Sequence, residues 1–181
     1  MLTSAGLETE NLKNFFLKLL PKSPQEIKAL FIPTAAINAD AISVLPKCMN
    51  DLLKCNIRKE NIKVYDMHKL MSIDEIKKYD VVYICGGDAD YLLYRVNEEG
   101  FNRVLTEYVM NGGFLVGVSA GSIIAAQNLT GNLGIINCHL SVHCAKGAEV
   151  GPLNLSDCPY IHLTNNQAIH ITKIGCASII E

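Results

Sequence analysis

Short apolar runs alternate with amphipathic stretches over residues 1–127 of the chain. Four runs predict strands of a parallel sheet: 29–32, 62–66, 80–85 and 114–118, of which 80–85 is expected to be buried and 114–118 to be buried on both faces. Residues 1–7 predict the end of a first strand, which is short on its N-terminal side. Apolar residues at helical spacing predict helices over 8–20, 40–55, 72–78, 89–96, 101–111 and 122–127. This alternation predicts parallel strands joined by right-handed crossovers.

Local signals refine this pattern at several points. Pro46 lies inside the predicted helix 40–55 and indicates a kink or a later start. Ser72 and Glu75 form a candidate capping box at the start of helix 72–78. After residue 127 the pattern changes to short strands at 138–144, 160–163, 168–172 and 177–180, with turns at 165–167 and 173–175. The chain is therefore expected to form one three-layer α/β domain over residues 1–181, with a mostly parallel sheet.

The composition is that of a compact globular protein. Of the 181 residues, 49% are hydrophobic and 19% are charged, which excludes a disordered chain. The net charge is −2 and the basic residues are scattered, so neither a nucleic acid nor a membrane surface is an expected partner. No apolar run reaches the roughly 18 residues of a transmembrane helix, and the first residues lack the layout of a signal peptide. The seven cysteines include no C-x-x-C pair, which predicts reduced thiols and a cytoplasmic location.

A strand-to-helix turn at residues 117–121 carries the clearest chemical signal. Its sequence, Gly117-Val118-Ser119-Ala120-Gly121, has the G-x-S-x-G pattern of a nucleophile elbow. Such an elbow pushes the serine hydroxyl out of the sheet, and its small flanking residues let strand and helix approach closely. Small-residue turns of this shape also occur in α/β proteins without catalysis, so the motif by itself leaves both interpretations open.

A second loop, Gly86-Gly87-Asp88, follows the predicted strand 80–85. Ligands of open parallel sheets bind at the carboxyl ends of the strands, where this loop and the elbow are both expected. Paired glycines let a backbone N–H approach a substrate carbonyl, so Gly87 and Ala120 are the candidate oxyanion donors. The alternative is that Gly86-Gly87 is only a tight turn.

A serine nucleophile needs a base, and the chain offers five histidines: His68, His139, His143, His162 and His170. Alternation along the predicted strand 138–144 places His139, Ser141 and His143 on one face. His143 is then at a strand end, where it could meet Ser119. A metal site is the alternative use of this segment, but alternation separates its cysteines, Cys138 and Cys144, from its histidines, so no metal is expected.

Three segments together resemble a known family. They are residues 82–93, the elbow, and Ser141-Val142-His143-Cys144, and they occur in the order found in the peptidase E (aspartyl dipeptidase) and cyanophycinase family of serine peptidases. The resemblance is closest to the small bacterial peptidase E-like members and extends from residue 31 to residue 169.

The resemblance implies a class I glutamine-amidotransferase-like (flavodoxin-like) fold, no cofactor, and cleavage of small peptides. In that family the substrates are dipeptides with an N-terminal aspartate, or cyanophycin. Carried over residue by residue, it implies Ser119 as nucleophile and His143 as general base, with the Gly87 and Ala120 amides as oxyanion hole. Gly86 is then part of the substrate-binding loop, and Asp88 lies at the pocket mouth to contact the substrate's amino end.

The chain departs from the family pattern in its charged residues. Family members place a triad acid between nucleophile and histidine, whereas residues 120–142 contain no Asp or Glu. Glu149 and Asp157, beyond the histidine, are the candidate substitutes. The arginines that follow the histidine in aspartyl dipeptidases are also missing, with only Lys146 nearby, so a preference for aspartyl substrates is not predicted.

Four functional hypotheses follow. The first is a serine peptidase acting on small peptides in a dipeptidase-like manner. The second, favoured by the missing acid, is a catalytically impaired relative that binds a small ligand or serves in an assembly. An esterase of the α/β-hydrolase fold is disfavoured because it needs an acid between serine and histidine. An amidotransferase or chaperone with a cysteine elbow is disfavoured because residue 119 is serine. A homodimer is a further expectation, by fold-level analogy.

Overall fold

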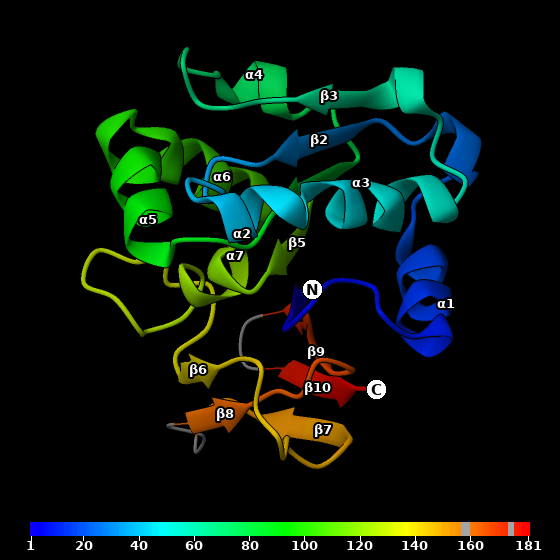
Figure 1. The fold of residues 1–181 in the computed structure, drawn as a ribbon, viewed down its shortest axis with the longest axis vertical. Coiled ribbons are helices and arrows are strands. Elements are labelled where there is room, and N and C mark those ends of the chain that lie inside the picture. The colour runs from blue at the N-terminus through cyan, green and yellow to red at the C-terminus, as the bar shows by residue number, and fades with distance from the viewer. Residues whose placement is uncertain (157–159, 174–175) are drawn as a thin grey trace.

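An eight-stranded sheet runs through the protein in the order β3-β2-β4-β5-β1-β9-β10-β7 (Figure 1). The computed structural model describes residues 1–156, 160–173 and 176–181. The strands of this sheet are β1 (Leu2–Thr3), β2 (Ala29–Ile32), β3 (Ile62–Val64), β4 (Val81–Ile84), β5 (Phe114–Val118), β7 (Gly151–Asn154), β9 (Ala168–Lys173) and β10 (Cys176–Ile180). Strands β3, β2, β4, β5 and β1 are parallel, and β9, β10 and β7 continue the sheet in antiparallel fashion. The predicted α/β class with a mostly parallel sheet is confirmed.

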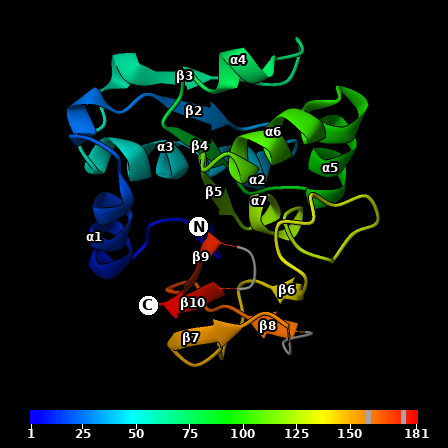
Figure 2. The same ribbon diagram turned by 180° about the vertical axis from the view of Figure 1, so that it is seen from behind.

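Helices cover both faces of the parallel half of the sheet (Figures 1 and 2). The helices are α1 (Glu10–Leu19), α2 (Ala39–Ser43), α3 (Leu45–Lys54), α4 (Ile73–Ile76), α5 (Ala89–Glu98), α6 (Phe101–Met110) and α7 (Ala120–Ile123). Helices α1 and α3 pack on one face, and α5, α6 and α7 pack on the other. A second, two-stranded parallel sheet pairs β6 (His139–Ser141) with β8 (Tyr160–His162).

The period-two alternation of the central strands builds the two cores. Along β4, Val82 and Ile84 enter the core under α5 and α6, while Val81 and Tyr83 enter the core under α1 and α3. All four of these side chains are fully buried. A strand buried on both faces is a continuous apolar run, which is why the sequence locates β2, β4 and β5 so closely. The carboxyl ends of β4 and β5 thereby come to lie side by side.

The local signals near the N-terminal half are confirmed. The predicted helix 40–55 is two helices, α2 and α3, which meet at Val44, and Pro46 occupies the first turn of α3. Proline is tolerated in this first turn because the N–H that it lacks has no partner there. Ser72 and Glu75 form the predicted capping box, since the Ser72 side chain accepts from the Glu75 N–H and the Glu75 side chain accepts from the Ser72 N–H.

The helix predicted at 122–127 is wrong in both bounds. Helix α7 begins at Ala120 and ends at Ile123. Beyond Ile123 the N–H groups take other partners: the Ala126 N–H donates to the Ile123 carbonyl at 3.2 Å, and the Gln127 N–H donates to the Cys138 carbonyl at 2.9 Å. The Ile123 carbonyl therefore lacks the bond from the Gln127 N–H that would continue the helix.

Two strands of the C-terminal part also differ from expectation. The predicted strand 138–144 is wrong at its end: β6 stops at Ser141, and His143 has a φ of 59°, which no strand residue adopts. Strand β7 is missing from the prediction because its Gly151 and Pro152 argue against a strand. It lies at the sheet edge, where proline costs no ladder hydrogen bond.

The candidate acid Asp157 and residues 174–175 of the predicted turn at 173–175 lie outside the described residues. In the described part of the chain, no helix combines the length and the apolar character needed to cross a membrane. The single-domain prediction for 1–181 stays a prediction.

Candidate active site

Ser119 occupies the sharp turn between β5 and α7, with φ of 47° and ψ of −105°. Steric contacts leave no room for a side chain at either glycine of the motif, Gly117 or Gly121. A Cβ at Gly117 would lie 2.6 Å from the Gly121 carbonyl oxygen, and a Cβ at Gly121 would lie 2.6 Å from the Ile84 carbonyl oxygen. Larger residues would therefore separate α7 from β4 and β5. The close packing holds a non-glycine residue in a strained conformation, as a nucleophile elbow requires.

The described structure joins Ser119, His143 and Asn165 in one hydrogen-bonded chain. Ser119 Oγ lies 3.0 Å from His143 Nε2, and His143 Nδ1 lies 2.7 Å from Asn165 Oδ1. Because an amide oxygen only accepts, Nδ1 carries the proton and donates it to Asn165, which leaves Nε2 free to accept the serine hydroxyl. His143 and Asn165 are exposed and Ser119 is half-buried, so a solute can reach the chain. This is the tautomer in which a histidine can act as a general base.

Each member of this chain comes from a different segment. Ser119 follows β5, His143 lies in the loop after β6, and Asn165 lies in the turn between β8 and β9. The pairing of β6 with β8, Ser141 opposite His162, brings the two loops to the same edge.

The Gly86-Gly87 loop lies directly beside the serine. A Cβ at Gly86 would come within 3.1 Å of Ser119 Cβ, and a Cβ at Gly87 would lie 2.1 Å from the Ala35 carbonyl oxygen. Gly87 also has a φ of 143°, which only glycine adopts readily. Within the described chain, the N–H groups of Gly87 and Ala120 donate to no protein acceptor. The chain bends at Gly87, and the Gly87 N–H in this loop and the Ala120 N–H at the start of α7 are both free to donate.

Asp88 serves as the N-cap of α5. Its Oδ1 accepts the Tyr91 N–H at 2.8 Å, and its own N–H donates to the Ala35 carbonyl at 2.8 Å. The side chain is half-buried. These contacts explain the residue structurally, and its contact with a substrate stays a prediction.

Sequence reasoning missed Asn165 as the partner of His143 Nδ1. It looked for an acid and named Glu149 and Asp157. Glu149 is exposed, and within the described residues the Nδ1 position is taken by Asn165. The sequence carries no signal for this role, because Asn165-Asn166-Gln167 is typical of any polar turn.

The alternative metal site is not assembled in the described structure. Cys138 is buried, whereas Cys144 Sγ lies 3.6 Å from His162 Nδ1, and the His139 ring stacks on Tyr160. Over residues 1–156, 160–173 and 176–181, no group of three or more His, Cys, Asp or Glu could hold a metal ion.

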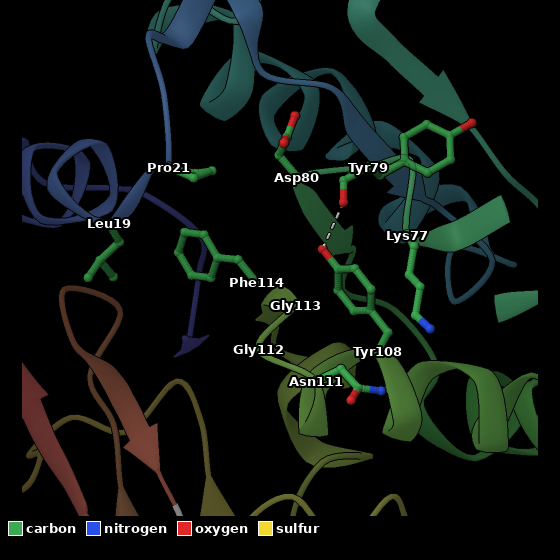
Figure 3. A pocket seen from close by; sticks show the side chains of 10 residues that line it. All are labelled: Leu19, Pro21, Lys77, Tyr79, Asp80, Tyr108, Asn111, Gly112, Gly113 and Phe114. Atoms are coloured by element: carbon green, nitrogen blue, oxygen red, sulfur yellow. Dashed lines mark hydrogen bonds between the residues drawn. The ribbon is translucent and has the colours of Figure 1, made fainter. Parts of the chain in front are cut away.

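A hollow of about 370 Å³ lies elsewhere on the molecule (Figure 3). Asp80 and Phe114 line it, and they stand at the amino ends of β4 and β5. Tyr108 lies inside and donates its hydroxyl to the Tyr79 carbonyl at 3.2 Å. Ser119 follows the opposite end of β5, so this hollow is not part of the site.

Comparison with known proteins identifies a matching family. The sequence model of peptidase family S51 matches residues 1–134, a range that includes the elbow and the Gly86-Gly87 loop. The match ends before His143 and Asn165, whose placement therefore rests on the structure.

Among curated proteins, the chain is similar to an uncharacterized peptidase of Pasteurella multocida, with 23% identity over 99 residues. It is also similar to one of Listeria innocua, with 26% identity over 103 residues. These matches cover 55% of the chain, and they span only about half the length of the relatives, 48% and 47%.

Among solved structures, the fold is similar to a Listeria monocytogenes protein provisionally described as peptidase E. The TM-score is 0.72 at 18% identity, with 98% of this chain and 95% of that chain covered. A peptidase from an acI-B1 Actinobacterium matches with a TM-score of 0.58 at 20% identity, over 78% of this chain and 66% of that one. At these identities the likeness shows the fold.

Proposed function

The chain belongs to peptidase family S51, and from that premise we propose that it is a serine peptidase that cleaves small peptides through an acyl-enzyme on Ser119. The observation that carries the proposal is the unbroken chain from Ser119 Oγ through both ring nitrogens of His143 to Asn165 Oδ1. The free N–H groups beside the serine complete the parts that acyl transfer needs.

Acylation begins when Ser119 Oγ attacks the carbonyl carbon of the scissile bond. His143 Nε2 accepts the serine proton as the Oγ–C bond forms, and the negative charge collects on the carbonyl oxygen. The Gly87 and Ala120 N–H groups donate to that oxygen. When the C–N bond breaks, His143 returns the proton to the leaving amine, and an ester on Ser119 remains.

Deacylation repeats these steps with water. His143 Nε2 takes a proton from water, the hydroxide attacks the ester carbonyl, and the same two N–H groups hold the oxyanion. Collapse of the intermediate breaks the Oγ–C bond, and His143 protonates Ser119 Oγ. Each step uses only side chains and backbone of this chain.

Asn165 orients the ring of His143 but carries no charge. In chymotrypsin-like serine proteases, replacing the triad aspartate with asparagine costs about 10⁴ in kcat because the histidine adopts the wrong tautomer. Here Asn165 Oδ1 faces Nδ1 and selects the productive tautomer, as asparagine does in papain-like Cys-His-Asn sites. The cost is then limited to the missing charge, and the site works without an acid.

The substrate class is small peptides, in keeping with the dipeptidase-like hypothesis. We propose that the Asp88 carboxylate, whose Oδ1 caps α5, also meets the amino end of the substrate. No preference for aspartyl substrates is proposed, because Lys146 is the one basic residue in the loop that follows His143, residues 144–150. The cytoplasmic location and the homodimer stay predictions from the sequence.

The test is reaction of the purified protein with a fluorophosphonate, followed by intact mass. Attack by Ser119 Oγ forms an O–P bond and expels fluoride, and His143 takes the proton. We expect one adduct on the wild type and on Ser141→Ala, which removes a half-buried hydroxyl outside the proposed machinery, and none on Ser119→Ala. A folded wild type that stays unlabelled at pH 8 would refute the peptidase and leave the ligand-binding relative. Labelling is followed by a screen of dipeptides with and without an N-terminal aspartate.

A further inference from the structure

The segment Thr3–Ser4 is hydrogen-bonded to all three residues of the proposed catalytic chain. Both residues are fully buried. Ser4 Oγ accepts the backbone N–H of His143 at 2.7 Å and lies 3.4 Å from Asn165 Oδ1, to which it donates. The Thr3 carbonyl accepts the backbone N–H of Ser119 at 3.0 Å. Two consecutive residues thus contact the nucleophile, the base and the residue that orients the base.

The backbone of Thr3–Ser4 is fixed from both sides. Thr3 is paired with Val118 of β5 on one side and with Ala168 of β9 on the other. The Ser4 N–H donates to the Gln167 carbonyl at 3.4 Å, next to the turn that holds Asn165. A group carried by this segment therefore has a set position relative to both the elbow and the Asn165 turn.

Building on the proposed function, we propose that Ser4 is a positioning residue of the catalytic site. Its hydroxyl holds His143 in the left-handed conformation and orients the Asn165 amide. Together these two effects present an unprotonated Nε2 to Ser119.

The first effect concerns the backbone of His143. Its φ of 59° is unfavourable for a residue with a Cβ, and it persists only where contacts hold it. The 2.7 Å bond from the His143 N–H to Ser4 Oγ is such a contact. Without it, the backbone can rotate toward ordinary values and carry the imidazole away from Ser119.

The second effect concerns the amide of Asn165. Because the Ser4 hydroxyl accepts from the His143 N–H, its own proton is free to donate, and Asn165 Oδ1 is the acceptor. At 3.4 Å this bond is long for O–H···O and correspondingly weak. It still favours Oδ1 over the amide NH₂ on this side, and Oδ1 is the atom that accepts from His143 Nδ1. An inverted amide would select the unproductive tautomer of His143.

The test compares Ser4→Ala with wild type by the second-order rate constant of fluorophosphonate labelling. We expect a fall of about 10²-fold, the size that a misplacement of about 1 Å produces. The control is Ser72→Ala, which removes the hydroxyl of an exposed helix cap outside the catalytic chain. Ser4→Cys keeps a group of similar size with a weak donor, and we expect an intermediate rate. If Ser4→Ala does not fold, the labelling rate of Ser4→Cys tests the proposal instead.

A second readout separates positioning from general destabilisation. The ¹⁵N chemical shifts of the His143 ring report its tautomer, and we expect Nδ1–H in wild type and a mixture in Ser4→Ala. The pH profile of labelling should change in Ser4→Ala and not in Ser72→Ala. Wild-type rate and tautomer in Ser4→Ala would overturn the proposal, and so would a slower rate with an unchanged tautomer and pH profile. If wild type is never labelled, the proposed function fails, while the ring shifts still decide whether Ser4 sets the tautomer.

Discussion

Replacing Asn165 by aspartate tests the physical role of the missing acid most directly. The substitution keeps an acceptor oxygen at the 2.7 Å contact with His143 Nδ1 and adds a full negative charge there. That charge stabilises the imidazolium that forms in the transition state. We therefore expect Asn165→Asp to react faster than the natural chain.

The expected increase in the reaction rate follows from the exposure of His143 and Asn165 to solvent. Two unit charges 4 Å apart attract by about 1 kcal/mol in water and by about 4 kcal/mol at an effective dielectric constant of 20. Since His143 and Asn165 are both exposed, the gain belongs near the lower figure, about 1–2 kcal/mol or about 5- to 30-fold in rate. Salt screens exposed charges, so the gain should shrink at high ionic strength.

The assay is the second-order rate constant of fluorophosphonate labelling, measured at low and at high salt. Asn166→Asp is the matched control, because it adds the same charge to the next, equally exposed residue of the same turn. We expect less than about a twofold change for this variant, the usual range for an exposed charge that lacks a close partner. If Asn165→Asp were no faster than Asn166→Asp, the amide of Asn165 would not act on His143, and the reasoning would be refuted.

Two further predictions concern stability and are measured by urea unfolding. Gly87→Ala should lower the free energy of unfolding by about 3–5 kcal/mol, because its Cβ would meet the Ala35 carbonyl oxygen at 2.1 Å in a conformation reserved for glycine. Gly100→Ala, with φ of 67° and open space around it, should cost only about 1–2 kcal/mol, and equal losses would contradict the contact argument. Asp51 is buried, where its Oδ2 accepts the Tyr83 hydroxyl at 2.6 Å, and burial raises the pKa of this carboxyl above its unfolded value. The contribution of Asp51 to stability is thus fully present below about pH 4 and is lost as the pH rises through the raised folded pKa. The free energy of unfolding of Asp51→Asn should therefore lack this decline with rising pH. Parallel pH profiles of the two proteins would contradict the prediction.

Local sequence patterns determined the elements that carry Ser119. Residues 114–118 are predicted as a strand and form β5 with those bounds, because an apolar run flanked by glycines has few alternatives. The elbow that follows is recognisable in part because the contact that requires Gly117, with the Gly121 backbone, spans only four residues, whereas Gly121 is required by Ile84 of β4. The Ser72–Glu75 capping box was equally readable, since its two partners are three residues apart.

Only the tertiary structure decided which groups meet at Ser119. His143 lies in the left-handed region two residues beyond the end of β6, and its N–H donates to Ser4, which is 139 residues away in the sequence. Asn165 Oδ1 meets His143 Nδ1 because the pairing of β6 with β8 brings its turn to the histidine. Nothing in the neighbourhood of these residues in the sequence records such contacts, since they depend on strand order and register across the whole sheet. Short-range patterns therefore specify the strands and the elbow, while His143 and Asn165 are placed by long-range pairing.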